Sequence, residues 1–285
     1  MPDLPALPPA ASQPLTVALL AHNDAVHVEN LISTWAEYLN GLERDYQLLL
    51  VDDGSVDDTT QRANGLREKV PRLEVLRHEW PAGVGAALRT ALSTARHPLF
   101  FYTLCDPRYR PDDLPRLLKS IDLVHCVAGY RAGRPVPAVW RTAGWLSRLL
   151  CRVILSAAPD PLPGWLGWRG HGAGLLARVF FGVRNRDVLC PYRLMRRDIF
   201  TRIPLQSNGP FVHVEILAKA NFLGCILSED APLGAIDRPV KAETRDGPGE
   251  DFFKEFRRVL DRPDFGPTVL PAPDKSTTTD ILPAG

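Results

Sequence analysis

Short apolar runs alternate with amphipathic segments through the first half of the chain, and this alternation limits the fold more than any other feature. The runs are mostly apolar, which is typical of strands buried on both faces, whereas the segments between them carry apolar residues at helical spacing. Such a pattern predicts an α/β domain with a mostly parallel central sheet and helices on both faces. The predicted strands are 15–20, 46–51, 73–77, 99–104 and 122–129, and the predicted helices are 28–42, 57–70, 83–96 and 111–120.

The second half is less regular, and we expect a helical elaboration beside the sheet, with helices at 139–156 and 212–222 and a strand at 225–233. One domain is predicted over 15–261. The proline-rich ends, 1–14 and 262–285, cannot bury enough apolar surface to offset the entropy of ordering, so both are expected to be disordered.

Composition excludes several classes of protein. With 45% hydrophobic and 24% charged residues, the chain is neither collagen-like nor a coiled coil. Its net charge of +1 does not suggest nucleic-acid binding. Residues 131–197, however, hold twelve Arg, no Lys and two acids, so this stretch carries +10 and the rest of the chain −9. The basic stretch is suited to bind anions.

Five scattered cysteines without a CxxC pair indicate reduced core residues rather than a disulfide framework or a zinc site. The N-terminal segment lacks the pattern of a signal peptide, and no window of about 18 apolar residues predicts a transmembrane helix. We therefore expect a cytoplasmic protein, with peripheral contact at the inner face of the membrane.

Two adjacent carboxylates, Asp52 and Asp53, follow the second predicted strand in the segment VDDGSVDDTT. Ligands of parallel α/β sheets bind beyond the carboxyl ends of the strands, and carboxylates there suit hydrogen bonds to ribose hydroxyls or a base N–H. The alternative is a strand-to-helix turn in which Asp and Ser act as caps, with Ser55 and Asp58 at the spacing of a capping box.

Five motifs together resemble the family-2 glycosyltransferases with the GT-A fold, nearest to the branch of dolichyl- or polyprenyl-phosphate mannosyltransferases. They are VALLAHNDAVHVENL, VDDGSVDDT, PAGVGAALRTAL, CDPRYRPDDLPRLL and VAGYRAGR, and the resemblance runs from about 15 to 238. It implies a nucleotide-diphosphate sugar donor and a polyprenyl (dolichyl-like) phosphate acceptor. The residues that it places at the donor are Ala21, Asn23 and Asp24 after the first strand, Asp52, Asp53 and Gly54 at the base and ribose, and Gly83 where backbone approaches the ligand.

The family's Asp-x-Asp metal and diphosphate site aligns with Leu104-Cys105-Asp106, so the first acid is replaced by Leu104. By resemblance Asp106 is a catalytic residue that holds Mg²⁺ or Mn²⁺, since such an ion can use one carboxylate together with substrate phosphates and waters. The alternative is that Asp106 caps a turn. Arg108 stands where the family has Gln, and we expect it to offset diphosphate charge where metal binding is weakened.

Arg131, in GYRAGR, occupies the position of a family arginine near the phosphates, where a guanidinium offers two parallel hydrogen bonds. Asp187, in the segment NRDVLCPYRLMRRDIF, matches an acid on the family's acceptor side and is predicted to act as a base or to position the acceptor. The alternative for Asp187 is a salt bridge to Arg186 or Arg193. Glu215 is expected to be structural.

Four of the six tryptophans lie in the basic segment 139–183, which we predict to face the acceptor and the membrane surface. The alternative is a folded subdomain with these rings in its core. The whole pattern predicts transfer of a hexose from a nucleotide sugar to a polyprenyl phosphate. The alternatives are a polysaccharide acceptor and a degenerate, non-catalytic protein that binds nucleotide sugars.

Overall fold

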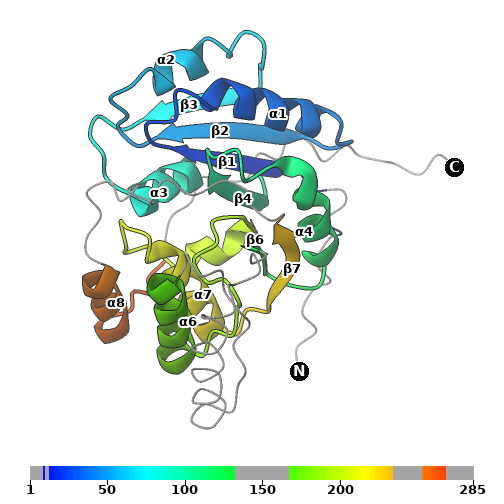
Figure 1. Cartoon of the computed structure of the whole chain (residues 1–285). Helices are drawn as coiled ribbons and strands as arrows, with labels where there is room; N and C mark the ends of the chain where they lie inside the picture. The colour runs from blue at the N-terminus through cyan, green and yellow to red at the C-terminus, as the bar shows by residue number, and fades with distance from the viewer. Residues whose placement is uncertain (1–8, 10–12, 132–166, 234–251, 268–285) are drawn as a thin grey trace, which may run out of the picture.

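The part of the chain described by the structure, a computed structural model, forms one seven-stranded sheet in the order β3-β2-β1-β4-β6-β5-β7 (Figure 1). The described residues are 9, 13–131, 167–233 and 252–267. The strands are β1 (Leu15–Ala21), β2 (Tyr46–Asp52), β3 (Leu73–Arg77), β4 (Leu99–Leu104), β5 (Cys126–Arg131), β6 (Arg193–Arg196) and β7 (Leu227–Leu233).

Strands β3, β2, β1 and β4 are parallel, β7 is parallel to β5, and β6 runs antiparallel to both β4 and β5. The predicted α/β fold with a mostly parallel sheet is therefore confirmed. β6 was not predicted as a strand, because four residues that begin and end with arginine look like a solvent-exposed segment. In the structure Arg193 and Arg196 are both buried.

Two apolar cores cover the two faces of the sheet. Alternate residues of β1 show the division, with Val17 and Leu19 in one core and Ala18 and Leu20 in the other. Helices α1 (Val28–Asn40), α2 (Thr59–Asn64) and α4 (Leu114–Ser120) line the first core, and α3 (Val84–Thr94), α6 (Gly167–Phe181), α7 (Val212–Phe222) and α8 (Phe252–Asp261) line the second. Short helices η2 (Pro111–Asp113) and η3 (Arg197–Thr201) lie in the connections.

Most predicted elements agree closely with the observed bounds, but several differ. Helix α2 begins at Thr59 rather than 57, and Ser55 does not form the predicted capping box because its hydroxyl donates to Asp52. The helix ends at Asn64, before Gly65, and helix α6 was not predicted. β5 begins at Cys126, after a turn. Helix α8 was not predicted, although it carries a buried Glu255 and Val259 on one side.

Several predictions fall on residues outside the described part of the chain. They are the helix at 139–156, most of the segment 139–183, and most of the two ends, 1–14 and 262–285. The first residues after α8 are described, and they contact α7 and the loop before it: Asp264 N donates to Gln206 Oε1 at 2.9 Å, and the Phe265 and Phe222 rings lie 6.2 Å apart.

Candidate active site

One edge of the sheet collects almost all the residues singled out in the sequence. Strands β1, β2, β4 and β5 end at this edge, and β6 begins there because it runs the opposite way. Asp187 precedes β6 in the chain, so the reversed strand brings it beside Arg131 at the end of β5. The directions of these strands therefore explain why segments more than 100 residues apart in the sequence lie at the same edge.

Asp52 at the end of β2 holds the turn that follows it. Its Oδ1 accepts the backbone N–H of Ser55 at 3.0 Å and the Ser55 hydroxyl, and its Oδ2 accepts the hydroxyl of Thr60. Asp52 is fully buried. Both carboxylate oxygens of Asp52 thus accept hydrogen bonds from the protein. This is the arrangement expected from the alternative interpretation, a strand-to-helix turn stabilised by Asp and Ser.

Asp53 connects the same turn to the segment after β3. Its Oδ1 accepts the N–H of Ala82 at 2.9 Å and lies 2.8 Å from Nδ1 of His78, and its Oδ2 accepts the N–H of Gly83 at 2.7 Å. Gly54 has φ +64°, and a Cβ there would lie 2.5 Å from the Pro81 nitrogen, so only glycine allows this approach. Asp53 and Gly54 together fix the path of residues 78–83.

The segment after β1 packs on the VDDGS turn. The Asn23 N–H donates to the Ser55 hydroxyl at 2.8 Å, and its side-chain oxygen accepts the N–H of Val56 at 3.0 Å. Asn23 has φ +54°, in the left-handed region that asparagine tolerates. Asp24 is buried and accepts the N–H of His22 at 3.1 Å. The structure therefore brings the first two predicted donor motifs together, from Ala21 onward.

Gly83 and Gly85, at the beginning of α3, allow another part of the chain to come close. A Cβ on Gly83 would lie 2.4 Å from the Asn208 carbonyl oxygen, and one on Gly85 would lie 2.0 Å from that of Ser207. The Gly85 N–H donates to Asn208 O at 2.7 Å. In the structure, then, the partner that these glycines admit is the loop before α7.

Two buried glutamates hold that loop. Glu215 accepts the N–H groups of Gln206 and Ser207 at 2.7 and 2.8 Å and pairs with Lys219 at 2.8 Å. Glu255 on α8 accepts the N–H groups of Asn208 and Gly209 at 2.7 and 2.6 Å. Glu215 has the structural contacts expected from the sequence, whereas the clamp by α8 was not foreseen.

Asp106, after β4, is held by Arg108. The Nε of Arg108 lies 2.9 and 2.8 Å from the two carboxylate oxygens, its Nη2 lies 2.5 Å from Oδ2, and its backbone N–H donates to Oδ1 at 2.9 Å. The side chains of Arg108 and Asp106 are 13% and 11% exposed. The turn contact proposed as the alternative is present, together with a charged fork that the sequence did not predict.

The residues at Asp106 do not fit a divalent cation. Leu104 offers no oxygen from its side chain, and the one carboxylate already accepts four hydrogen-bond contacts from three donor groups of Arg108. Among residues 13–131, 167–233 and 252–267, no group of three or more His, Cys, Asp or Glu side chains is placed to hold a metal. Mg²⁺ and Mn²⁺ bind through oxygen ligands, and the guanidinium has taken those that Asp106 provides.

Arg131 and Asp187 form a buried ion pair. The Arg131 Nε and Nη2 lie 2.6 and 2.8 Å from the two Asp187 oxygens, with the side chains 4% and 2% exposed. Burial alone would lower the pKa of Arg131, but the hydrogen bonds and charge of Asp187 raise this pKa well above its ordinary value. The salt bridge of Asp187 is thus made with Arg131 rather than with Arg186 or Arg193.

Glu229 on β7 supports this pair and was not recognised in the sequence. Its two oxygens accept the N–H groups of Arg186 and Asp187 at 2.6 and 3.0 Å. Burial raises the pKa of the Glu229 carboxyl, and the two N–H groups partly counter this rise. The available signal in the sequence was an acidic residue inside a predicted strand. A carboxylate in such a strand suggests a hydrogen-bond partner at the nearby site.

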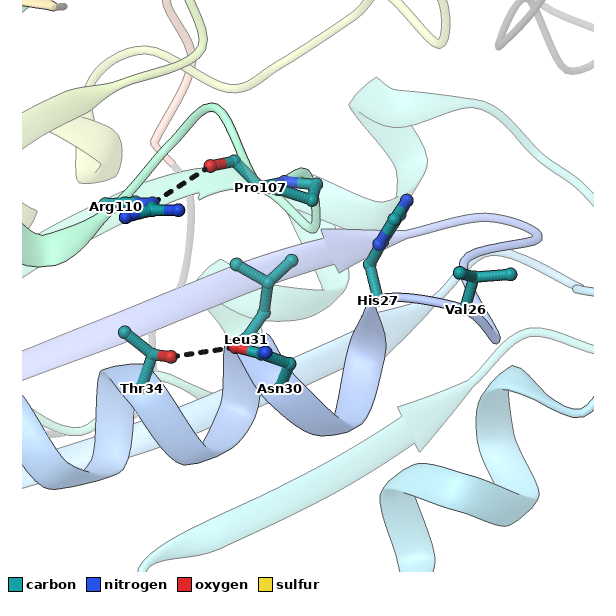
Figure 2. Close-up of a pocket in the computed structure, with 7 residues that line it drawn as sticks. All are labelled: Val26, His27, Asn30, Leu31, Thr34, Pro107 and Arg110. Carbon is teal, nitrogen blue, oxygen red and sulfur yellow. Dashed lines mark hydrogen bonds between the residues drawn. The ribbon is translucent and has the colours of Figure 1, made fainter.

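A cavity of about 340 Å³ lies beside the site, between the beginning of α1 and the loop after β4 (Figure 2). Figure 2 shows Leu31 on α1, and His27 immediately before α1, on the side that faces the loop with Pro107 and Arg110. The cavity shares the β4 loop with Asp106 but is lined by none of the predicted site residues. Its lining residues are Val26, His27, Asn30, Leu31, Thr34, Pro107 and Arg110.

Solved structures show the fold class. Glucosyl-3-phosphoglycerate synthase from Mycobacterium tuberculosis, in a complex with Mn²⁺, UDP and glucosyl-3-phosphoglycerate, matches with a TM-score of 0.56 at 19% identity, over 90% of this chain and 84% of that one. Mannosyl-3-phosphoglycerate synthase from Rubrobacter xylanophilus matches with a TM-score of 0.59 at 19% identity, over 87% and 74%. The fold is that of the GT-A glycosyltransferases.

The family follows from the sequence match. The model of glycosyl transferase family 2 matches residues 16–203, and the chain belongs to that family. A dolichol-phosphate mannosyltransferase from Pyrococcus furiosus is 28% identical over 211 residues, which cover 73% of this chain and 53% of that protein. The chain therefore spans about half the length of the curated relative it matches.

Proposed function

We propose that the chain transfers a hexose from a nucleotide-diphosphate sugar to a polyprenyl phosphate. The observation that carries the proposal is that the VDDGS turn, Asp106 with Arg108, and Arg131 with Asp187 lie at strand ends on the same edge of the sheet. At this edge the turns after β1 and β2 have fixed backbone conformations, and the ends of β4 and β5 carry the guanidinium groups of Arg108 and Arg131. In a nucleotide diphosphate, the nucleoside would contact the turns and the two phosphates the guanidinium groups.

On the donor side, Asp52, Asp53 and Gly54 act in this proposal by holding the walls of the nucleoside site in place. Their direct contact with ribose or base stays a prediction, since both carboxylates already have partners in the protein. The complex of the M. tuberculosis enzyme with UDP named above, and a further complex of that enzyme with Mn²⁺, UDP-glucose and phosphoglyceric acid (TM-score 0.54), support a nucleotide-sugar donor.

On the acceptor side, both groups of relatives are named for phosphate-bearing compounds, and the sequence relative favours the lipid phosphate proposed here. The P. furiosus relative is named for dolichol phosphate, and the structural neighbours are named for 3-phosphoglycerate. Attack by an acceptor phosphate oxygen forms the new bond at the sugar C1, while the bond from C1 to the donor diphosphate breaks and the nucleoside diphosphate leaves with the electron pair. An ionised phosphate needs little proton abstraction, so Asp187 orients Arg131 toward the phosphates rather than acting as a strong base.

The Mg²⁺ or Mn²⁺ that the sequence led us to expect on Asp106 is not part of this proposal. Mn²⁺ in the complexes of the M. tuberculosis enzyme supports such an ion, and the fork between Arg108 and Asp106 speaks against it. The steps assigned above to residues of this chain do not depend on the ion.

A lipid acceptor requires contact with a membrane surface, and an aromatic face on α6, α7 and α8 supports this. Phe180, Phe222 and Phe253 are exposed there. Lys254 and Arg257 lie on the same helix as Phe253. Exposed aromatic rings beside basic side chains suit the headgroup level of an anionic membrane. In the described part of the chain, no helix is both long and apolar enough to cross a bilayer.

The test is an assay of purified protein with UDP- and GDP-hexoses against three acceptors: a polyprenyl phosphate, 3-phosphoglycerate and a polysaccharide. A glycosylated polyprenyl phosphate, detected by mass spectrometry, is the expected product. Transfer to another acceptor alone would replace the acceptor assignment, and tight nucleotide binding without turnover on any acceptor would favour the non-catalytic alternative. Arg131→Lys, which keeps the charge but loses the fork, should lower turnover by about tenfold or more.

Membrane contact is tested separately by co-sedimentation with vesicles that contain anionic lipid. Phe180→Ser and Phe253→Ser should each reduce binding at low salt. Leu123→Ser is the matched control, because Leu123 is 80% exposed but lies outside this aromatic face. Equal binding by all three variants would remove the aromatic face from the proposal.

A further inference from the structure

The Asp106–Arg108 pair stands where a GT-A enzyme of this family has its metal and diphosphate site. Four hydrogen-bond contacts connect the two residues across a single intervening Pro107, and both side chains are nearly buried. Buried, charge-assisted forks of this kind are among the stronger hydrogen-bonded arrangements in proteins. A cation that used Asp106 would first have to displace the guanidinium.

Charge balance points the same way. Two carboxylates with a divalent cation have a net charge of zero. In this chain Leu104 removes one negative charge and Arg108 adds one positive charge, so Asp106 and Arg108 reach the same zero without an ion. Before the donor binds, a divalent cation added to this pair would leave a net charge of +2 beside two nearly buried side chains, where uncompensated charge is costly.

We propose that the Arg108 guanidinium, oriented by Asp106, takes the place of the divalent cation at the donor diphosphate, so that the protein binds nucleoside diphosphates without metal. This inference rests on the proposed function. Asp106 engages the Nε–Nη2 edge of the guanidinium, and Nη1 is buried. In this proposal the donor phosphate approaches the guanidinium from its Nη1–Nη2 edge. Asp106 is thereby a positioning residue, and Arg108 is the group that touches the donor.

Arg131 lies at the end of the neighbouring strand β5, and both arginines act on the buried Tyr109. The Arg108 guanidinium carbon is 5.7 Å from the centre of the Tyr109 ring, and Arg131 acts electrostatically on its hydroxyl. Burial raises the pKa of Tyr109, so its hydroxyl is neutral and adds no negative charge to the site. Two fixed guanidinium groups at one edge can thus spread over two phosphates, as a metal ion does between them.

The experiment measures binding of UDP and GDP by calorimetry, first with EDTA and then with Mn²⁺ or Mg²⁺ in place of EDTA. The wild-type Kd for the nucleotide that binds should change less than about twofold, because no ion takes part. Arg108→Gln should weaken binding in EDTA by about tenfold to hundredfold, the loss of a fork to a charged group. Arg110→Gln, an exposed arginine two residues away, is the matched control and should bind like the wild type.

A second variant tests the reverse change. Leu104→Asp combined with Arg108→Gln rebuilds an Asp-x-Asp pair, and its nucleotide binding should become dependent on Mn²⁺. Paramagnetic resonance of Mn²⁺ reads this directly: bound Mn²⁺ is expected with UDP in the double variant and not in the wild type. Melting temperatures confirm that each variant is folded.

Three outcomes would overturn the inference. In the first, wild-type nucleotide binding falls more than tenfold in EDTA while the protein still transfers sugar with metal, so that only the metal-free role of Arg108 fails. In the second, folded Arg108→Gln binds nucleotide in EDTA as tightly as the wild type. In the third, neither UDP nor GDP binds under any condition, which overturns the proposed function itself.

Discussion

Arg131 and Asp187 are 56 residues apart in the sequence, yet the guanidinium donates to both oxygens of the carboxylate inside the protein. The backbone N–H of Arg131 also donates to Asp187, at 3.3 Å. The pair exists because β6 reverses direction between β4 and β5 and brings the residues before it to the end of β5. A residue predicted as a base is therefore engaged in holding an arginine.

Removing one partner of this pair should strongly destabilise the fold. Asp187→Asn leaves the Arg131 charge buried without its counter-ion, and we expect a loss of about 3–5 kcal/mol in the free energy of unfolding. Urea denaturation measures the loss. Asp198→Asn, at an exposed acid, is the control and should change stability by less than about 0.5 kcal/mol.

A double variant of the same pair tests this explanation. Arg131→Met with Asp187→Leu removes both charges together, and this double variant should be more stable than Asp187→Asn, because no buried charge is left without a partner. A double variant less stable than the single one would show that the ion pair is not the reason for the effect of Asp187→Asn.

Gly85 should not tolerate a methyl group. A Cβ at this position would lie 2.0 Å from the Ser207 carbonyl oxygen, so Gly85→Ala must push the loop before α7 away, and we expect a loss of about 3 kcal/mol. Gly174 in α6 is the matched control, since a Cβ there meets nothing within 4 Å. Gly174→Ala should stabilise the protein by about 0.5–1 kcal/mol, because alanine is the better helix former. Equal effects in thermal denaturation would contradict the packing explanation.

Asp53 should control the mobility of the segment after β3. Asp53→Asn replaces an acceptor oxygen by an NH₂ group, which then faces a backbone N–H donor, either Ala82 or Gly83. Hydrogen exchange of these two amides should accelerate by about tenfold or more, in line with a lost hydrogen bond of about 1–3 kcal/mol. Asp58→Asn, at an exposed acid near the beginning of α2, should leave their exchange unchanged.

His213 should make stability fall in acid. Burial, followed by the charges of Arg193 and Arg131, lowers the pKa of His213 well below its ordinary value of 6.5, and its Nδ1 lies 3.0 Å from the Tyr102 hydroxyl. Below pH 6.5 the unfolded chain therefore takes up a proton that the folded protein does not. This single group should lower the free energy of unfolding by about 1.4 kcal/mol between pH 8 and pH 5.5.

The measurement is the difference between wild type and His213→Gln in urea denaturation at several pH values. The variant has lost the titrating group, so the wild type should lose about 1.4 kcal/mol more than the variant over this pH range. Parallel curves for the two proteins would mean that His213 is protonated in the folded state as readily as in the unfolded one.

The main elements, and the edge where the candidate residues gather, could be predicted because their signals are local. The strands 73–77 and 99–104 and the helix at 212–222 have the observed bounds, since a continuous apolar run or a helical repeat is contained within a few residues. The edge site could also be predicted, because strand ends of a parallel sheet converge wherever the strands themselves are correct.

The partners within the site could not be predicted in the same way. Asp106 with Arg108, Arg131 with Asp187, and Glu229 with the N–H of Asp187 depend on distances and rotamers that no spacing encodes. β6 was missed for a related reason. From the sequence, its arginines would be assigned to the surface. In the structure Arg193 is buried because it donates to the backbone carbonyls of Val188 and His213.

The sequence alone thus determined the class of fold, the order of the strands along the chain and the edge where charged residues gather, because hydrophobic burial follows periodicity. Only the tertiary structure decided which charges meet. A carboxylate paired with a guanidinium differs chemically from one that can bind a metal or accept a proton. Which of these applies depends on the direction of a strand and on the packing of buried side chains.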